Sequence, residues 1–161
     1  MTADDLAAVR DIAASIHPTL PERIEVFAEK LRLFPRGCFV LESVGGVAGY
    51  ALAHPWRLRA IPPLDAFLTQ ISAAADCLYL HDAAVLPAAR GKGAAPRLVA
   101  LLRALAAEAG LPRLALVSVY GTSVLWNRLG FAAVEDTGLA KALAFYGDGA
   151  TYMAAPTARW G

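Results

Sequence analysis

Hydrophobic residues recur with helical spacing in the first third of the chain. Apolar positions over residues 6–16 predict one amphipathic helix, which His17-Pro18 ends, and residues 22–33 predict a second helix behind Pro21. Two strand-like segments, 38–42 and 47–53, then flank Gly45-Gly46, a pattern typical of a β-hairpin. Residues 55–63 are predicted to form a loop and residues 64–75 a third helix.

A nearly continuous apolar run follows over residues 77–86 and predicts a central strand buried on both faces. After two glycines, Leu98, Leu101, Leu102 and Leu105 occur at i, i+3, i+4 and i+7, which predicts an amphipathic helix. The remaining pattern predicts a strand over 114–119, a short helix over 121–128, a strand over 132–135, and one or two closing strands through Tyr152. Strands and helices in this order indicate one domain over residues 1–161 with a three-layer α/β fold.

Composition and charge narrow the function classes. The net charge is +1 with arginines scattered along the chain, so there is no electrostatic footprint for nucleic acid. No apolar stretch is long enough to span a membrane, and Asp4-Asp5 stand where a signal peptide would be basic, so we expect a cytoplasmic protein. Cys38 and Cys77 are expected to be buried, reduced thiols.

The sequence also argues against a metal site. Its three histidines, His17, His54 and His81, lie far apart, and none has a cysteine at ligand spacing. We therefore expect no metal.

The segment 85–96 carries the clearest chemical signal. A strand leads into Gly91 and Gly93, and a helix follows, so unpaired first-turn N–H groups and the helix dipole would favour an anion there. Arg90, Lys92 and Arg97 add positive charge to this turn. Arg97 is expected to be a solvated helix residue, with contact to a phosphate as the alternative. An ordinary strand-to-helix turn is the alternative. Two other phosphate motifs do not match. A Walker A loop needs Ser or Thr directly after Gly91-Lys92, where Gly93 stands, and a dinucleotide-binding fingerprint needs glycine at position 96, which is proline.

Arg90-x-x-Gly93-x-Ala95, preceded by Ala84-Val85-Leu86-Pro87, resembles the acyl-coenzyme A motif of the GNAT superfamily of N-acetyltransferases. Residues 122–131 resemble the family's second block, with Thr122 where alanine is usual. The resemblance covers residues 37–137 well. It implies the family's three-layer α/β/α fold (α+β in some schemes) around a mixed sheet. Helical spacing starts almost at Met1, so the family's usual first strand is expected to be absent or reduced.

The resemblance implies transfer of an acetyl group from acetyl-coenzyme A to a primary amine of a small molecule or a protein N-terminus. The backbone of Val85 and Leu86 would hold the pantetheine arm, and one of their N–H groups would polarise the thioester carbonyl. The pyrophosphate would rest on the loop N–H groups, with the Arg90 side chain nearby. These N–H groups belong to Gly91, Lys92, Gly93, Ala94 and Ala95.

Candidate proton-transfer residues follow from the same comparison. The run His81-Asp82-Ala83-Ala84-Val85 is similar to His-x-Leu-Ala-Val of arylalkylamine acetyltransferases, which makes His81 a candidate base. A buried structural histidine is the alternative. Strand alternation places Asp82 on the opposite face, where a structural pair or an ammonium contact would satisfy it. Many members of the family carry a tyrosine at the position of Trp126, and that tyrosine can protonate the leaving thiolate. Tryptophan cannot act as an acid, so Trp126 is expected to pack against the cofactor arm or the core.

Tyr120 is a substitute candidate for the general acid, although the thiolate could also leave unassisted. We expect the acceptor pocket to include His54, Trp56 and Tyr146, with Tyr152 a further candidate. The absence of an acidic cluster disfavours a polyamine acceptor. Monomer and homodimer both stay open. Two rival functions remain: an acyl-coenzyme A sensor of this fold without turnover, and a nucleotide-phosphate binder of another fold.

Overall fold

The computed structural model describes residues 1–158. Its α-helices are α1 (Leu6–Ile16), α2 (Ile24–Leu33), α3 (Ala94–Glu108), α4 (Ser123–Arg128) and α5 (Ala140–Leu143). Its strands are β1 (Cys38–Ser43), β2 (Gly46–Trp56), β3 (Cys77–Val85), β4 (Arg113–Ser118), β5 (Ala132–Ala133) and β6 (Thr151–Pro156). Short 3-10 helices are η1 (Ala3–Asp5), η2 (Pro35–Gly37), η3 (Pro87–Ala89), η4 (Thr137–Leu139) and η5 (Ala144–Tyr146).

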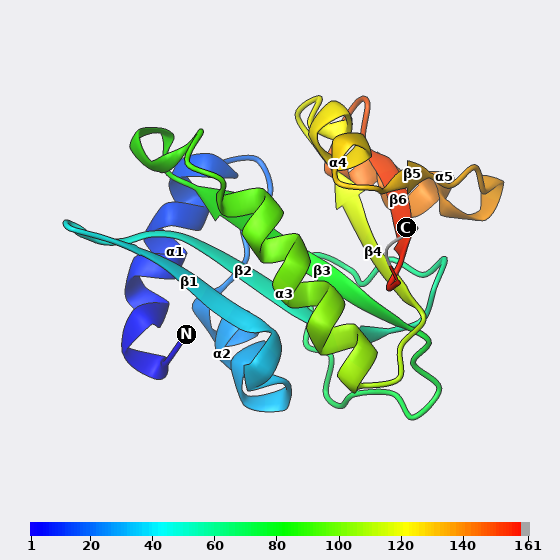
Figure 1. Ribbon diagram of the computed structural model, residues 1–161, viewed down its shortest axis with the longest axis horizontal. Coiled ribbons are helices and arrows are strands. Elements are labelled where there is room, and N and C mark those ends of the chain that lie inside the picture. The colour runs from blue at the N-terminus through cyan, green and yellow to red at the C-terminus, as the bar shows by residue number, and fades with distance from the viewer. Residues whose placement is uncertain (159–161) are drawn as a thin grey trace.

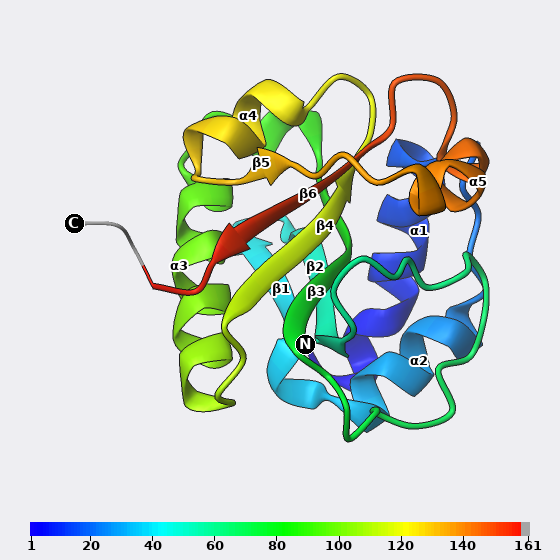
Figure 2. The same cartoon turned by 90° about the vertical axis from the view of Figure 1, so that its right-hand side faces the viewer.

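The strands form one mixed sheet in the order β1-β2-β3-β4-β6-β5. Only the central pair, β3 and β4, is parallel among these strands, and the other neighbours are antiparallel. Helix α3 covers one face of the sheet and α1 with α2 cover the other (Figures 1 and 2). The expected three-layer fold around a mixed sheet is therefore confirmed. The described residues begin with helices, so the family's usual first strand is absent from them.

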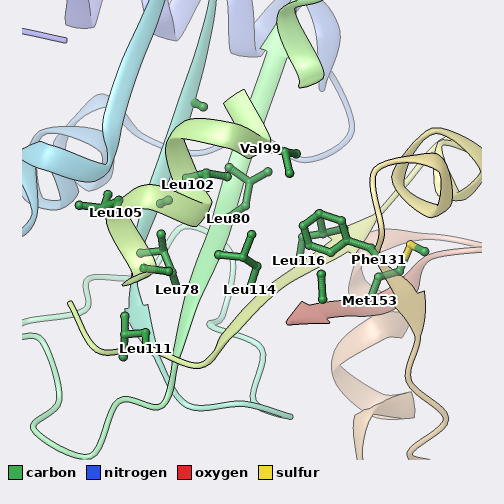
Figure 3. Packing of buried hydrophobic residues seen from close by; sticks show 14 residues of the cluster. Leu78, Leu80, Val99, Leu102, Leu105, Leu111, Leu114, Leu116, Phe131 and Met153 are labelled. Carbon is green, nitrogen blue, oxygen red and sulfur yellow. The ribbon is translucent and has the colours of Figure 1, made fainter. Parts of the chain in front are cut away.

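The α3 face of the sheet holds the largest apolar cluster (Figure 3). Buried residues of α3 pack onto leucines of β3 and β4, with Phe131 and Met153 at one side. The helix buries Val99, Leu102, Leu105 and Ala106, whereas Leu101 is 52% exposed. The prediction that Leu101 belongs to the buried face of this helix was therefore wrong, because Leu101 lies at the edge of that face.

This contrast provides a test of the core. Leu102→Ala should lower the free energy of unfolding by about 2–5 kcal/mol, because it deletes fully buried methyl groups and leaves a cavity. Leu101→Ala, the same change one position earlier, should stay within about 0.5 kcal/mol of wild type. Urea unfolding followed by circular dichroism measures both. Equal losses in the two variants would contradict this assignment of the core.

The opposite face is covered by α1 and α2, whose buried residues Val9, Ile12 and Phe27 pack on Tyr50 and Leu52 of β2. Cys38 and Cys77 are both buried as free thiols, which confirms the expectation for them. Burial raises the pKa of Cys38 to about 11 and that of Cys77 to about 12. Both thiols are therefore protonated and unreactive near neutral pH.

The segment between β2 and β3 contradicts the helix predicted over residues 64–75. It is irregular, and Asp65 and Thr69 take positive φ angles of 53° and 64°. Two carboxylates, Glu29 in α2 and Glu22 just before it, bind backbone N–H groups of this segment. Glu29 accepts the N–H groups of Leu68 and Thr69 at 2.7 and 2.9 Å. Side chains thus satisfy backbone donors that a helix would have satisfied internally.

None of the helices within residues 1–158 is long and apolar enough to cross a lipid bilayer.

Candidate active site

A cavity of about 800 Å³ opens where the two central strands separate. Their parallel ladder runs from Cys77–Arg113 to Leu80–Leu116, but β3 continues to Val85 and β4 to Ser118. The cavity wall includes the diverging ends of β3 and β4, the loop between α1 and α2, and α4. It also includes the loop around residues 90–95, here called the glycine loop. The divergence therefore joins the predicted anion loop and the predicted proton-transfer residues in one space.

The glycine loop has the geometry that an anion cradle requires. Gly91 and Gly93 take φ angles of 75° and 77°, and a Cβ at either position would point into open space. Gly93 is the N-cap of α3 and gives the helix no side-chain cap, so the first-turn N–H groups face outward. Gly91, Gly93, Ala94 and Ala95 all line the cavity. These residues fit a pyrophosphate.

Val85 and Leu86, the two residues predicted to hold the pantetheine arm, differ in which backbone groups are available to a ligand. The Leu86 N–H donates to Ala48 O at 2.8 Å, so Leu86 has no N–H left for a ligand. Val85 lines the cavity at the end of β3, beyond the last pair with β4. Its carbonyl accepts the Arg90 Nε–H at 2.9 Å. Val85 is therefore the better-placed member of the pair, and Arg90 lies directly beside it.

A β-bulge sets the polar face of the cavity. Leu52 pairs with Asp82 and Ala53 pairs with Leu80, so His81 has no partner residue on β2. His81 and Asp82 consequently both face α1 and α2, where His81 meets Glu22 and Asp82 meets His17. The alternation that placed Asp82 on the opposite face was wrong, because a bulge interrupts the two-residue period.

His81 is paired with a carboxylate that the sequence analysis missed. Its Nε2 lies 3.1 Å from Glu22 Oε1, and the two side chains are 0% and 3% exposed. The other nitrogen, Nδ1, is buried with no hydrogen-bond partner among the described residues. His81 as a whole is 7% exposed, so its backbone supplies its exposed surface. The imidazole therefore meets Glu22 rather than a ligand.

Glu22 is held in its ionised form. Burial raises its pKa, but the charges of His81 and Lys30 and the Asp65 N–H together bring that pKa below the ordinary value. The Asp65 N–H donates to Oε2 at 3.0 Å. The only sequence signal for this residue was its place directly after Pro21, at the start of the helix predicted over 22–33.

A second histidine–carboxylate pair lies on the same cavity and was also missed. His17 Nε2 is 3.2 Å from Asp82 Oδ1, and Tyr50 donates its hydroxyl to Asp82 Oδ2 at 2.5 Å. On the far side of the ring, His17 Nδ1 is 3.4 Å from the hydroxyl of Tyr120. Among the residues that the structure describes, no group of three or more His, Cys, Asp or Glu side chains is placed to hold a metal ion.

The two aromatic residues predicted near the thioester both line the cavity. Trp126 projects from α4 and packs edge-on against Phe131, with ring centroids 5.6 Å apart. Tyr120 follows β4 with a φ of 53° and is 53% exposed. Tyr120 is thus an exposed residue whose backbone has a conformation that non-glycine residues seldom adopt.

The predicted acceptor residues separate into two groups. Tyr146 lines the cavity, whereas His54, Trp56 and Tyr152 do not. His54 is 0% exposed and packs against Trp56 and His81. Burial, aided by His81, lowers the pKa of His54 to about 3, so His54 is neutral. Tyr152 is buried and accepts the Arg59 N–H at 3.0 Å.

Comparisons with known proteins agree with this geometry. Residues 6–131 match the model of the acetyltransferase (GNAT) family. A search of curated protein sequences finds no significant match. Among solved structures, the chain is similar to the GphF GNAT-like decarboxylase in complex with isobutyryl-CoA, with 18% identity, a TM-score of 0.78, and coverage of 98% of this chain and 97% of that chain.

Two further solved structures share the fold. Ard1 from Thermoplasma volcanium has 15% identity and a TM-score of 0.74, with 99% and 95% of the two chains covered. The ribosomal-protein-S18-alanine N-acetyltransferase from Escherichia coli has 22% identity and a TM-score of 0.66, with 100% and 93% covered. The matched sequence model and the shared fold lead to one conclusion: the chain belongs to the acetyltransferase (GNAT) family and is an acyltransferase.

Proposed function

We propose that the protein transfers an acetyl group from acetyl-coenzyme A to a primary amine of a small molecule or a protein N-terminus. The observation that carries this proposal is that one cavity joins the glycine loop to a buried histidine–carboxylate pair. Acyl transfer needs the donor oriented, the amine deprotonated and the developing oxyanion stabilised, and this cavity offers a group for each task.

The donor would be held by the loop and by β3. Its pyrophosphate would lie on the N–H groups from Gly91 to Ala95, with the side chains of Arg90 and Lys92 adding positive charge. The Val85 backbone would hold the pantetheine arm, and the Val85 N–H would polarise the thioester carbonyl, because Leu86 already donates to Ala48. Trp126 would pack against the arm.

The proton leaving the amine would be accepted by the Glu22–His81 pair. The two groups lie 3.1 Å apart and are almost fully covered, so a change in either one acts directly on the other. Glu22 is ionised and can attract an ammonium group, while His81 fixes its position. Tyr146, which shares the cavity wall, would contact the acceptor.

The choice of amine would follow from the modest negative charge that two carboxylates give to the cavity wall. Glu22 and Asp82 line the cavity together with Ile16, Leu20 and Leu64, which favours an amine on an apolar carrier. His54 and Trp56 would act behind His81 rather than on the acceptor, since neither lines the cavity.

A thiol-release screen tests this function. Purified protein, acetyl-coenzyme A, and a panel of small primary amines and N-terminal peptides are mixed, and free thiol is measured against a no-amine blank. Amine-dependent release together with the acetylated product supports the proposal. Calorimetric binding of coenzyme A without release for any amine would instead indicate an acyl-coenzyme A sensor. Absence of any binding would overturn both functions.

A further inference from the structure

Tyr120, His17 and Asp82 form a continuous chain of polar contacts across the gap between β3 and β4. Asp82 lies on β3, Tyr120 follows β4, and His17 reaches both from the end of α1. The His17 and Tyr120 rings stack with centroids 5.6 Å apart and an interplanar angle of 15°. His17 therefore both supports the Tyr120 ring and touches its hydroxyl.

The contacts fix which nitrogen of His17 always carries a proton. Nε2 lies 3.2 Å from a carboxylate oxygen of Asp82 and 3.4 Å from Ala83 O, and both of these groups only accept hydrogen bonds. Nε2 is therefore the protonated nitrogen, and only Nδ1, which faces Tyr120, can gain or lose a proton. The arrangement follows the logic of a catalytic triad, in which a carboxylate orients an imidazole toward a hydroxyl.

The protonation state of Nδ1 decides where the Tyr120 hydroxyl hydrogen points. When His17 is neutral, Tyr120 donates to Nδ1. When His17 is an imidazolium, Nδ1–H donates to the Tyr120 oxygen, and the hydroxyl hydrogen is free to point into the cavity.

Charged and titratable neighbours favour the imidazolium. The groups facing His17 are Asp82 and Tyr120, with the charge of Glu22 nearby and Tyr50 acting through Asp82. Burial lowers the pKa of His17, but the hydrogen bond and charge of Asp82 outweigh burial, so this pKa lies above its ordinary value.

We infer that His17 and Asp82 are positioning residues for Tyr120, and that the three form a relay that protonates the thiolate leaving in acyl transfer. The inference rests on the proposed function and supplies the acid that Trp126 cannot supply.

The proton balance of the step is simple. As the carbon–sulfur bond of the thioester breaks, the Tyr120 O–H proton moves to sulfur and forms the thiol. The Nδ1 proton of His17 moves to the Tyr120 oxygen, which leaves a neutral imidazole held by Asp82. The amine proton goes to the Glu22–His81 pair and then to solvent, and His17 recovers its proton from solvent.

The test compares His17→Gln and Tyr120→Phe with wild type, using acetyl-coenzyme A and an amine from the panel. Each variant should lower kcat roughly 10²-fold, a usual contribution of one acid catalyst, and the double variant should lose no more than either single one. Wild type should show a fall of kcat at high pH as His17 loses its proton, and His17→Gln should lack that fall. Arg10→Gln, an exposed change on the same helix, should match wild type.

The donor identifies which step the relay serves. With p-nitrophenyl acetate, whose leaving group needs no proton, His17→Gln and Tyr120→Phe should acetylate the amine at wild-type rates. A loss that persists with this donor would place the relay on the amine side and overturn the inference. Unchanged kcat in both variants would also overturn it while leaving the proposed function intact. A wild-type protein inactive with every amine would fail at the proposed function, and the inference would fall with it.

Discussion

Gly93→Val will weaken binding of coenzyme A by roughly a hundredfold or more, about 2.8 kcal/mol. Gly93 has a φ of 77°, which a β-branched residue adopts only with strain, and it is the N-cap of α3. The added Cβ would meet no protein atom within 4 Å, so protein packing does not explain the glycine. The valine side chain would instead occupy the space into which the loop N–H groups point.

Isothermal titration of coenzyme A measures this effect. Gly45→Val is the matched control, because Gly45 lies in the β1–β2 turn with an ordinary φ and open space around its Cβ position. Thermal unfolding of both variants separates lost binding from lost folding. Wild-type affinity in folded Gly93→Val would remove the loop from the binding site.

The second large effect is expected at His81. His81→Ala should lower kcat by about 10²–10³-fold, because it removes half of the pair that accepts the amine proton. It also removes a positive neighbour that lowers the pKa of Glu22, so burial then raises that pKa. The acidic limb of the pH–rate profile should therefore move to higher pH. The affinity for coenzyme A should not change.

His81→Gln provides the comparison, since an amide can still donate to Glu22 but cannot titrate. It should keep the fold and bind coenzyme A like wild type, yet show a reduced kcat. Stopped assays across pH 5–9 would compare the three proteins. If both variants reproduce the wild-type profile, His81 has no part in proton transfer.

Much of the fold could be predicted from local pattern. The helix over 6–16 has the predicted bounds, and the glycine loop lies between a strand and a helix as expected. The helix predicted over 64–75 failed because carboxylates of Glu22 and Glu29, far away in sequence, satisfy that segment's N–H groups. Local propensity does not contain such distant partners.

The candidate site was predictable only where its parts are local. The loop residues 90–95 are contiguous, so their spacing was informative. Glu22 and His81 are 59 residues apart, and His17 and Tyr120 are 103 apart, so nothing in either local sequence predicts the contact. The orientation of Asp82 was also hidden, because no local signal at residues 80–82 marks a bulge.

The bulge has a consequence for how β3 of this protein tolerates change at residue 81. Because the flanking residues Leu80 and Asp82 already pair with successive residues of β2, position 81 is surplus to the ladder. A change of identity there, or the loss of that single codon, would leave every neighbouring side chain on its present face. The strand register therefore does not depend on residue 81, and a substitution there acts through the contacts that its side chain makes with Glu22 and His54.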